Sequence, residues 1–119
     1  MSKESILFIY NAGSSAIAQA IDFFHKIASP ATYQCNLCKI TYGSLKMNPE
    51  WKRFVEGLRL KIQFLHKDEF EKSYKDYKTA YPAALREREG NLEEFISVNE
   101  MNGFQNLDQL IQAVKEKLQ

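Results

Sequence analysis

Ile6-Leu7-Phe8-Ile9-Tyr10 is a continuous apolar run of strand-forming residues. Such a run is typical of a strand that is buried on both faces of a sheet. The next residues, Asn11-Ala12-Gly13-Ser14-Ser15, interrupt the pattern, because Gly13 permits unusual backbone angles and a serine can cap a following helix. We therefore expect a central strand over 6–10 that leads directly into a helix.

Further along the chain, the pattern alternates between helices and strands. Apolar residues at spacings of three and four predict helices over 15–29, 50–57, 67–78 and 107–118. Alternation at period two predicts a second strand over 60–66, and two runs on either side of Gly90-Asn91, 83–88 and 92–98, predict an antiparallel hairpin. Tyr81-Pro82, directly before this hairpin, predicts an extended or cis-proline junction.

The composition is that of an ordinary globular domain. Hydrophobic residues make up 45% of the 119 residues and charged residues 26%, so we expect a single domain, 1–119, with a sufficient core. The net charge of +1 gives no reason to expect a nucleic-acid partner. The apolar run near the N-terminus is too short for a signal peptide or a membrane span. We expect a cytoplasmic protein that does not associate with membranes.

The segment 31–48 contains the only two cysteines, Cys35 and Cys38, in a Cys-x-x-Cys spacing. Thr32 is a candidate cap for a short helix that holds both cysteines and ends at Gly43. The β propensity of Ile40-Thr41-Tyr42 favours an extended segment instead. The residues leave both alternatives open.

The predicted order of elements resembles the thioredoxin-like fold over nearly the whole chain. The residues that carry the resemblance are the strand 6–10, Tyr81-Pro82 before the third strand, and Gly90-Asn91 in the final hairpin. The block 29–38, SPATYQCNLC, also resembles that of a little-characterised group of small bacterial proteins. The resemblance implies an α/β three-layer sandwich, in which a mixed four-stranded sheet has helices on both faces. The first and second strands should be parallel, because helices join them and such crossovers need a dozen or more residues. We expect a helical cysteine-bearing insert between the first helix and the second strand.

The cysteines do not stand where thioredoxin-family enzymes have theirs, which is directly after the first strand and facing the cis-proline. Here that place is taken by Asn11-Ala12-Gly13-Ser14, and the cysteines follow one whole helix later. A chain that runs up the first strand and down the first helix reaches the opposite edge of the sheet near Pro30. The cysteines share an edge with Pro82 only if the insert climbs back.

Three interpretations of the cysteine pair follow from the residue types. In thiol–disulfide exchange, Cys35 would be the nucleophile and Cys38 the resolving thiol, with no cofactor. Positions i and i+3 share one helix face, so the pair can instead be small apolar packing. The pair can also supply half of a zinc shell, with His25 as the candidate third ligand, although His25 also suits a helix end, where it would interact with the helix dipole.

A separate candidate site lies beyond the carboxyl ends of the strands. Ligands of open α/β sheets favour this edge, and helix N-termini bind anions. We expect Asn11, Ser14, His66 and Pro82 to meet there as a ligand or anion site. The alternative is a capped strand-to-helix connection without a ligand.

The function that these patterns favour is thiol–disulfide exchange through Cys35 and Cys38 with a protein thiol or disulfide partner. The alternative is a non-catalytic module that binds a protein or a metal through the cysteine segment. The two differ in whether both thiols react and whether a metal is bound. Neither the substrate nor the oligomeric state has a recognisable signature in the chain.

Overall fold

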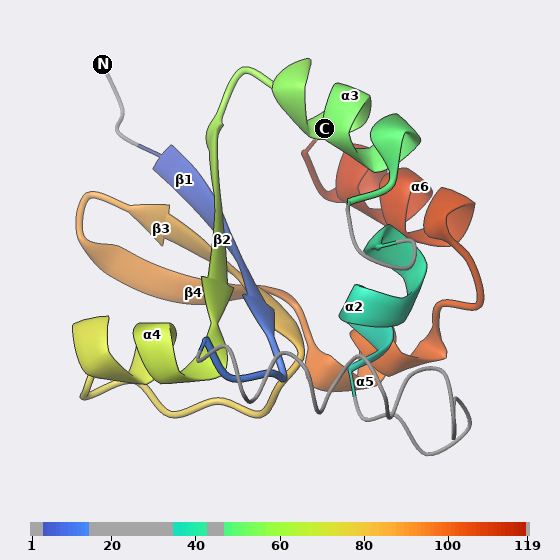
Figure 1. Cartoon of the computed structure of the whole chain (residues 1–119). Helices are drawn as coiled ribbons and strands as arrows, with labels where there is room; N and C mark the ends of the chain where they lie inside the picture. Colours follow the sequence, from blue (N-terminus) through green and yellow to red (C-terminus); the bar gives the residue numbers. More distant parts are fainter. Residues whose placement is uncertain (1–3, 15–34, 43–46, 119) are drawn as a thin grey trace.

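A mixed four-stranded sheet forms the centre of the molecule, as seen in a computed structural model that describes residues 4–14, 35–42 and 47–118. Its order is β2-β1-β3-β4 (Figure 1). β1 is parallel to β2 and antiparallel to β3, which pairs antiparallel with β4. The predicted parallel pair and closing hairpin are therefore confirmed. The strands are β1 (Glu4–Tyr10), β2 (Lys61–His66), β3 (Ala83–Arg88) and β4 (Asn91–Ile96).

Helices cover both faces of this sheet, as predicted. Side chains alternate along β1, so Ile6 and Phe8 pack on one face while Leu7 and Ile9 pack on the other. The first face is covered by α2, α3, α5 and α6, and the second by α4 (Figure 1). Phe70 of α4 is buried against Leu7 and Ile9 on the second face. The expected helix over 15–29 lies outside the described residues. The described helices are α2 (Asn36–Thr41), α3 (Pro49–Glu56), α4 (Lys67–Ser73), α5 (Val98–Gly103) and α6 (Leu107–Leu118).

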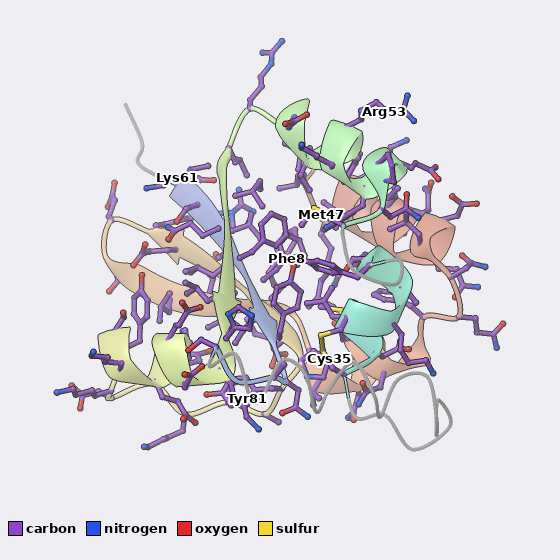
Figure 2. All side chains as sticks on the ribbon, viewed as in Figure 1. Phe8, Cys35, Met47, Arg53, Lys61 and Tyr81 are labelled. Atoms are coloured by element: carbon purple, nitrogen blue, oxygen red, sulfur yellow. A yellow bond between two sulfur atoms is a disulfide. The ribbon has the colours of Figure 1, made fainter. Side chains whose placement is uncertain are left out.

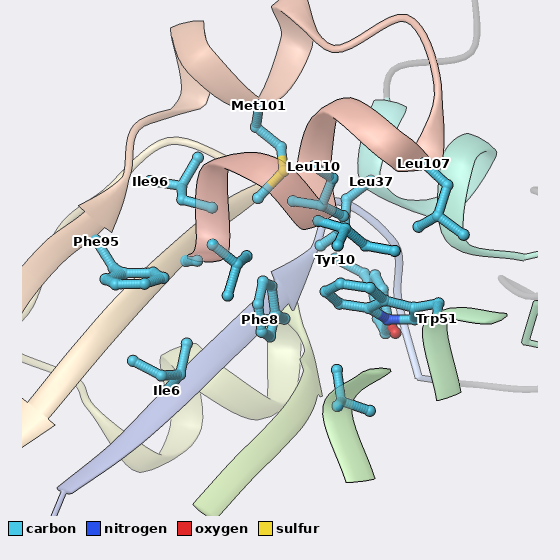
Figure 3. Packing of buried hydrophobic residues seen from close by; sticks show 14 of the residues in the cluster. Ile6, Phe8, Tyr10, Leu37, Trp51, Phe95, Ile96, Met101, Leu107 and Leu110 are labelled. Carbon is cyan, nitrogen blue, oxygen red and sulfur yellow. The ribbon is translucent and has the colours of Figure 1, made fainter. Parts of the chain in front are cut away.

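The larger core cluster joins distant parts of the chain around Phe8 (Figure 3). The ring of Phe8 meets Trp51 of α3 edge-on at 5.2 Å between centroids, and it stacks on Phe64 of β2 at 5.7 Å. Leu37 of α2 and Leu110 of α6 are fully buried in the same cluster. The cysteine-bearing helix is therefore part of the main core.

The helix expected over 67–78 is shorter than predicted, because α4 ends at Ser73. The chain beyond it returns to the start of β3, and its aromatic side chains pack on Phe70 as it does so. The rings of Tyr74, Tyr77 and Tyr81 lie 5.1, 6.2 and 6.3 Å from that of Phe70. Tyr74 and Tyr77 therefore contact Phe70 from beyond the end of α4, where the periodicity had predicted a continuing helix.

The turn of the hairpin is one residue earlier than predicted. Glu89 and Gly90 have φ values of 52° and 84°, the left-handed conformation that a tight two-residue turn between twisted strands requires. Asn91 already belongs to β4. Of the two alternatives predicted for the junction before this hairpin, extended or cis-proline, the structure has the second, because the Tyr81–Pro82 peptide bond is cis.

β4 ends at Ile96, short of the predicted 98, because Ser97 begins a helix that the periodicity did not reveal. Ser97 Oγ accepts a hydrogen bond from the Glu100 amide, and the Glu100 carboxylate accepts one from the Ser97 amide, both at 3.1 Å. This reciprocal capping box starts α5. In the part of the chain that the structure describes, no helix is both long and apolar enough to cross a membrane.

Candidate functional site

The cysteine pair lies at the start of the short helix α2. Cys35 is the residue that caps this helix, and its Sγ accepts a hydrogen bond from the Cys38 amide at 3.3 Å. Thr32, the predicted cap, lies outside the described residues. The helix ends at Thr41, and Tyr42 has extended backbone and bridges to Met47. The predicted short helix is therefore present but ends at Thr41, and the predicted extended conformation is found only from Tyr42.

Cys35 and Cys38 form a disulfide, with their Cα atoms 5.3 Å apart (Figure 2). The two sulfur-bearing side chains differ in exposure, because Cys35 has no exposed surface while Cys38 is partly exposed. The pair is therefore neither sealed inside the core nor fully open. Cys38 is the more exposed residue of the pair, although it also packs against the main core.

Cys35 lies at the edge of the sheet where β1 ends. The backbone amide of Asn11, the residue after β1, donates a hydrogen bond to Cys35 Sγ at 3.4 Å. Ile9 of β1 pairs with Ala83 of β3, so Pro82 lies at this same edge. Figure 2 shows Cys35 and Tyr81 at the same end of the sheet. The displaced Cys-x-x-Cys thus shares an edge with the cis-proline.

Both residues between the cysteines fix α2 in place. The side-chain amide of Asn36 donates to the carbonyl oxygens of Met101 and Phe104, at 2.7 and 2.8 Å. Leu37 is fully buried in the main core. These contacts attach the disulfide-bearing helix to α5 and to the interior, so the position of the couple is set by tertiary structure.

Aromatic rings border the sheet edge beside the couple. Tyr10, the last residue of β1, stacks on Phe64 at 6.2 Å and meets Tyr42 edge-on at 5.7 Å. Burial raises the pKa of the Tyr10 phenol far above its usual range, with a smaller contribution from Tyr42. Tyr10 therefore stays neutral and forms an apolar boundary to this edge.

The second candidate site is occupied by a carboxylate of the protein itself. The Ser14 amide donates to Asp68 Oδ1 at 3.0 Å, and the Ser14 hydroxyl donates to the other carboxylate oxygen. The hydroxyl hydrogen bond is the main reason that the pKa of Asp68 lies below its usual value. Asp68 thus accepts the two hydrogen bonds from Ser14 that a bound anion would need. The helix that was expected to follow Ser14 lies outside the described residues.

The four residues predicted for that site share an edge but make separate contacts. Asn11 Oδ1 accepts a hydrogen bond from Lys67 Nζ at 3.3 Å, whereas His66 contacts Glu69 through its amide and its ring, at 2.8 and 2.9 Å. The amide of His66 is the main cause of the lowered pKa of Glu69. Pro82 is buried.

Sequence reasoning missed the roles of Lys67, Asp68 and Asn36 at this edge. The sequence did contain a signal for Lys67 and Asp68. They are charged residues directly after the predicted strand 60–66, and the end of that strand lies at the same edge of the sheet as the loop after β1. No signal marked Asn36, because its two acceptors lie more than 60 residues away in the chain.

The zinc interpretation depends on a third ligand beside the cysteine pair. Within 4–14, 35–42 and 47–118, no group of three or more His, Cys, Asp or Glu side chains could hold a metal ion. His25, the predicted third ligand, lies outside these ranges. In the disulfide both sulfurs are bonded to each other, so zinc would need the reduced form.

Comparison of the chain with protein-family models, with curated proteins and with solved structures gave no match.

Proposed function

We propose that this protein is a thioredoxin-like thiol–disulfide exchange protein whose reactive couple is Cys35 and Cys38. The observation that carries the proposal is the hydrogen bond from the Asn11 amide to Cys35 Sγ. This contact holds the disulfide, in which the residue Cys38 is partly exposed, at the sheet edge that also bears the cis-proline. A cytoplasmic location fits this chemistry, because disulfides of cytoplasmic proteins are usually transient and catalytic.

The reaction moves one disulfide bond between the protein and a dithiol partner. A partner thiolate attacks one sulfur of the couple, forms a mixed disulfide with it, and releases the other cysteine as a thiolate. The second partner thiolate then attacks the partner sulfur of the mixed disulfide. The partner leaves oxidised, the couple is reduced, and the released thiolates take protons from solvent. The reverse sequence reduces a partner disulfide.

The test is to equilibrate the folded protein with defined ratios of reduced and oxidised dithiothreitol or glutathione. Thiols are trapped by acid and alkylation, and the masses are read at each ratio. We expect one reversible two-electron transition that involves both cysteines. The protein should also accelerate exchange between a disulfide-bonded peptide and a dithiol, and a variant with both cysteines replaced by serine should not.

Two other outcomes would contradict the proposal, and each identifies a different alternative. A couple that exchanges only after denaturation would be structural packing. Stoichiometric zinc on protein purified without chelator, together with thiols that do not exchange, would indicate the metal-binding module. In that case His25→Ala should reduce the zinc content, whereas His66→Ala, at the sheet edge, should leave it unchanged.

A further inference from the structure

The two cysteines of the disulfide are unequal in exposure. An attacking thiolate approaches a disulfide along the line of its S–S bond, so it must reach the outer side of the sulfur that it attacks. Cys35 has no exposed surface and contacts the residue after β1, whereas Cys38 is partly exposed. Access therefore directs an incoming sulfur to Cys38.

The hydrogen bonds at the disulfide also favour attack at Cys38 with Cys35 as the leaving group. The amides of Asn11 and Cys38 both donate to Cys35 Sγ, at 3.4 and 3.3 Å. When the S–S bond breaks, these donors stabilise negative charge on Cys35, and a better stabilised thiolate leaves faster.

The donor from Asn11 is itself held in place. Lys67 Nζ donates to the side-chain oxygen of Asn11, and the Lys67 amide donates to the Ala12 carbonyl, at 3.3 and 3.2 Å. Together these bonds tie Asn11 and Ala12, the two residues directly after β1, to Lys67. The stabilising amide is thus in position before the S–S bond breaks.

We infer that partner thiolates attack Sγ of Cys38 and that Cys35 leaves as the buried thiolate. The inference rests on the proposed exchange function and specifies which sulfur is attacked and which one leaves. In this step, the partner sulfur bonds to Cys38 and the Cys35–Cys38 bond breaks with its electron pair on Cys35. The released thiolate later attacks Cys38 to expel the partner, or is protonated once a second partner thiol has resolved the mixed disulfide. The order is the reverse of the one expected from the residue types, in which Cys35 is the nucleophile and Cys38 the resolving thiol.

The two single-cysteine variants form a matched test. Cys35→Ser leaves the accessible sulfur, and Cys38→Ser leaves the buried one. Each reduced variant is mixed with 5,5′-dithiobis(2-nitrobenzoate), and mixed-disulfide formation is followed by absorbance and intact mass. We expect Cys35→Ser to react at least about tenfold faster, because exchange rates depend on access to the attacking sulfur. Equal rates, or a faster Cys38→Ser variant, would overturn the inference.

A measurement on the unaltered protein covers the case in which a variant does not fold. The oxidised protein is exposed briefly to excess glutathione, quenched in acid and alkylated, and the peptide with both cysteines is fragmented in a mass spectrometer. A glutathione adduct on Cys38 supports the inference, and a majority on Cys35 overturns it while leaving the exchange function intact. No adduct on either cysteine of the folded protein, with adducts appearing after denaturation, would overturn the proposed function and this inference with it.

Discussion

The side-chain amide of Asn36 lies 2.7 Å from the carbonyl oxygen of Met101, across 65 positions of the chain. It makes a second hydrogen bond to the Phe104 carbonyl at 2.8 Å. An asparagine between two cysteines therefore attaches the disulfide-bearing helix to the end of α5, and this attachment can be tested directly.

Asn36→Ala should destabilise the oxidised protein by about 1 to 3 kcal/mol, because it leaves two partly buried carbonyl groups without their donor. Urea unfolding followed by circular dichroism measures the loss. Asn102→Ala is the matched control, since Asn102 is exposed on the neighbouring helix α5. Equal losses in the two variants would show that the Asn36 hydrogen bonds contribute nothing specific.

Leu37→Ala should lower the free energy of unfolding by about 2 to 5 kcal/mol, because Leu37 is fully buried and its truncation leaves a cavity in the main core. Lys39→Ala alters an exposed residue of the same helix and should cost less than about 0.5 kcal/mol. The comparison uses equilibrium denaturation of the oxidised forms. A Leu37→Ala variant as stable as the unaltered protein would mean that α2 does not contribute to the core.

Ser14→Ala should raise the pKa of Asp68 toward its ordinary value, because the Ser14 hydroxyl is the main group that lowers it. The rise should be partial, since the Ser14 amide still donates to the carboxylate. Carbon-13 NMR titration of the Asp68 carboxyl measures the change. Ser73→Ala, at the exposed end of α4, should leave the titration unchanged. An unchanged titration in Ser14→Ala would contradict the assigned contact.

The protein should lose stability in acid partly through Glu4. The Arg86 guanidinium, 2.7 Å from Glu4, donates the hydrogen bond that chiefly lowers the pKa of this carboxyl from its ordinary 4.5. The folded state therefore binds this proton less readily than the unfolded chain does. Its contribution is present above pH 4.5 and is lost as the pH falls through the lowered pKa of the folded state.

Urea unfolding between pH 7 and pH 3 tests this dependence. Glu4→Gln should make the fall in stability shallower below pH 4.5, because the variant carries no titrating group at this position. Arg86→Gln should have a similar effect, since it removes the hydrogen bond that lowers the pKa. Slopes that match the unaltered protein in both variants would count against the role of this ion pair in acid unfolding.

Periodicity predicted most of the fold because the strands and long helices have one clear pattern each. The run Ile6–Tyr10 is buried as expected, and the parallel pairing of β1 with β2 follows from the helical connection between them. The short helix α5 was missed because six residues are too few for a periodic signal. Its capping pair, Ser97 and Glu100, was the local evidence that could have revealed it.

The geometry of the cysteine pair could not be predicted, because it depends on contacts between distant parts of the chain. The spacing of Cys35 and Cys38 permits either sulfur to be the exposed one. The hydrogen bond from the Asn11 amide joins residues 24 positions apart, and nothing in the local sequence of α2 indicates it. Likewise, the contact between Ser14 and Asp68 joins residues 54 positions apart, and the local sequence did not indicate it.

The donor that reaches Cys35 from the loop after β1 has a consequence for partly folded chains. A partly folded chain in which only α2 has formed has both cysteines at the same spacing. It does not yet have the hydrogen bond from the Asn11 amide to Cys35 Sγ, because the loop after β1 is not in place. The chemistry of the sulfurs would therefore differ between newly made chains and finished molecules. The rate at which the thiols react, followed over time after synthesis or refolding, should therefore report when the tertiary structure of the whole domain has formed.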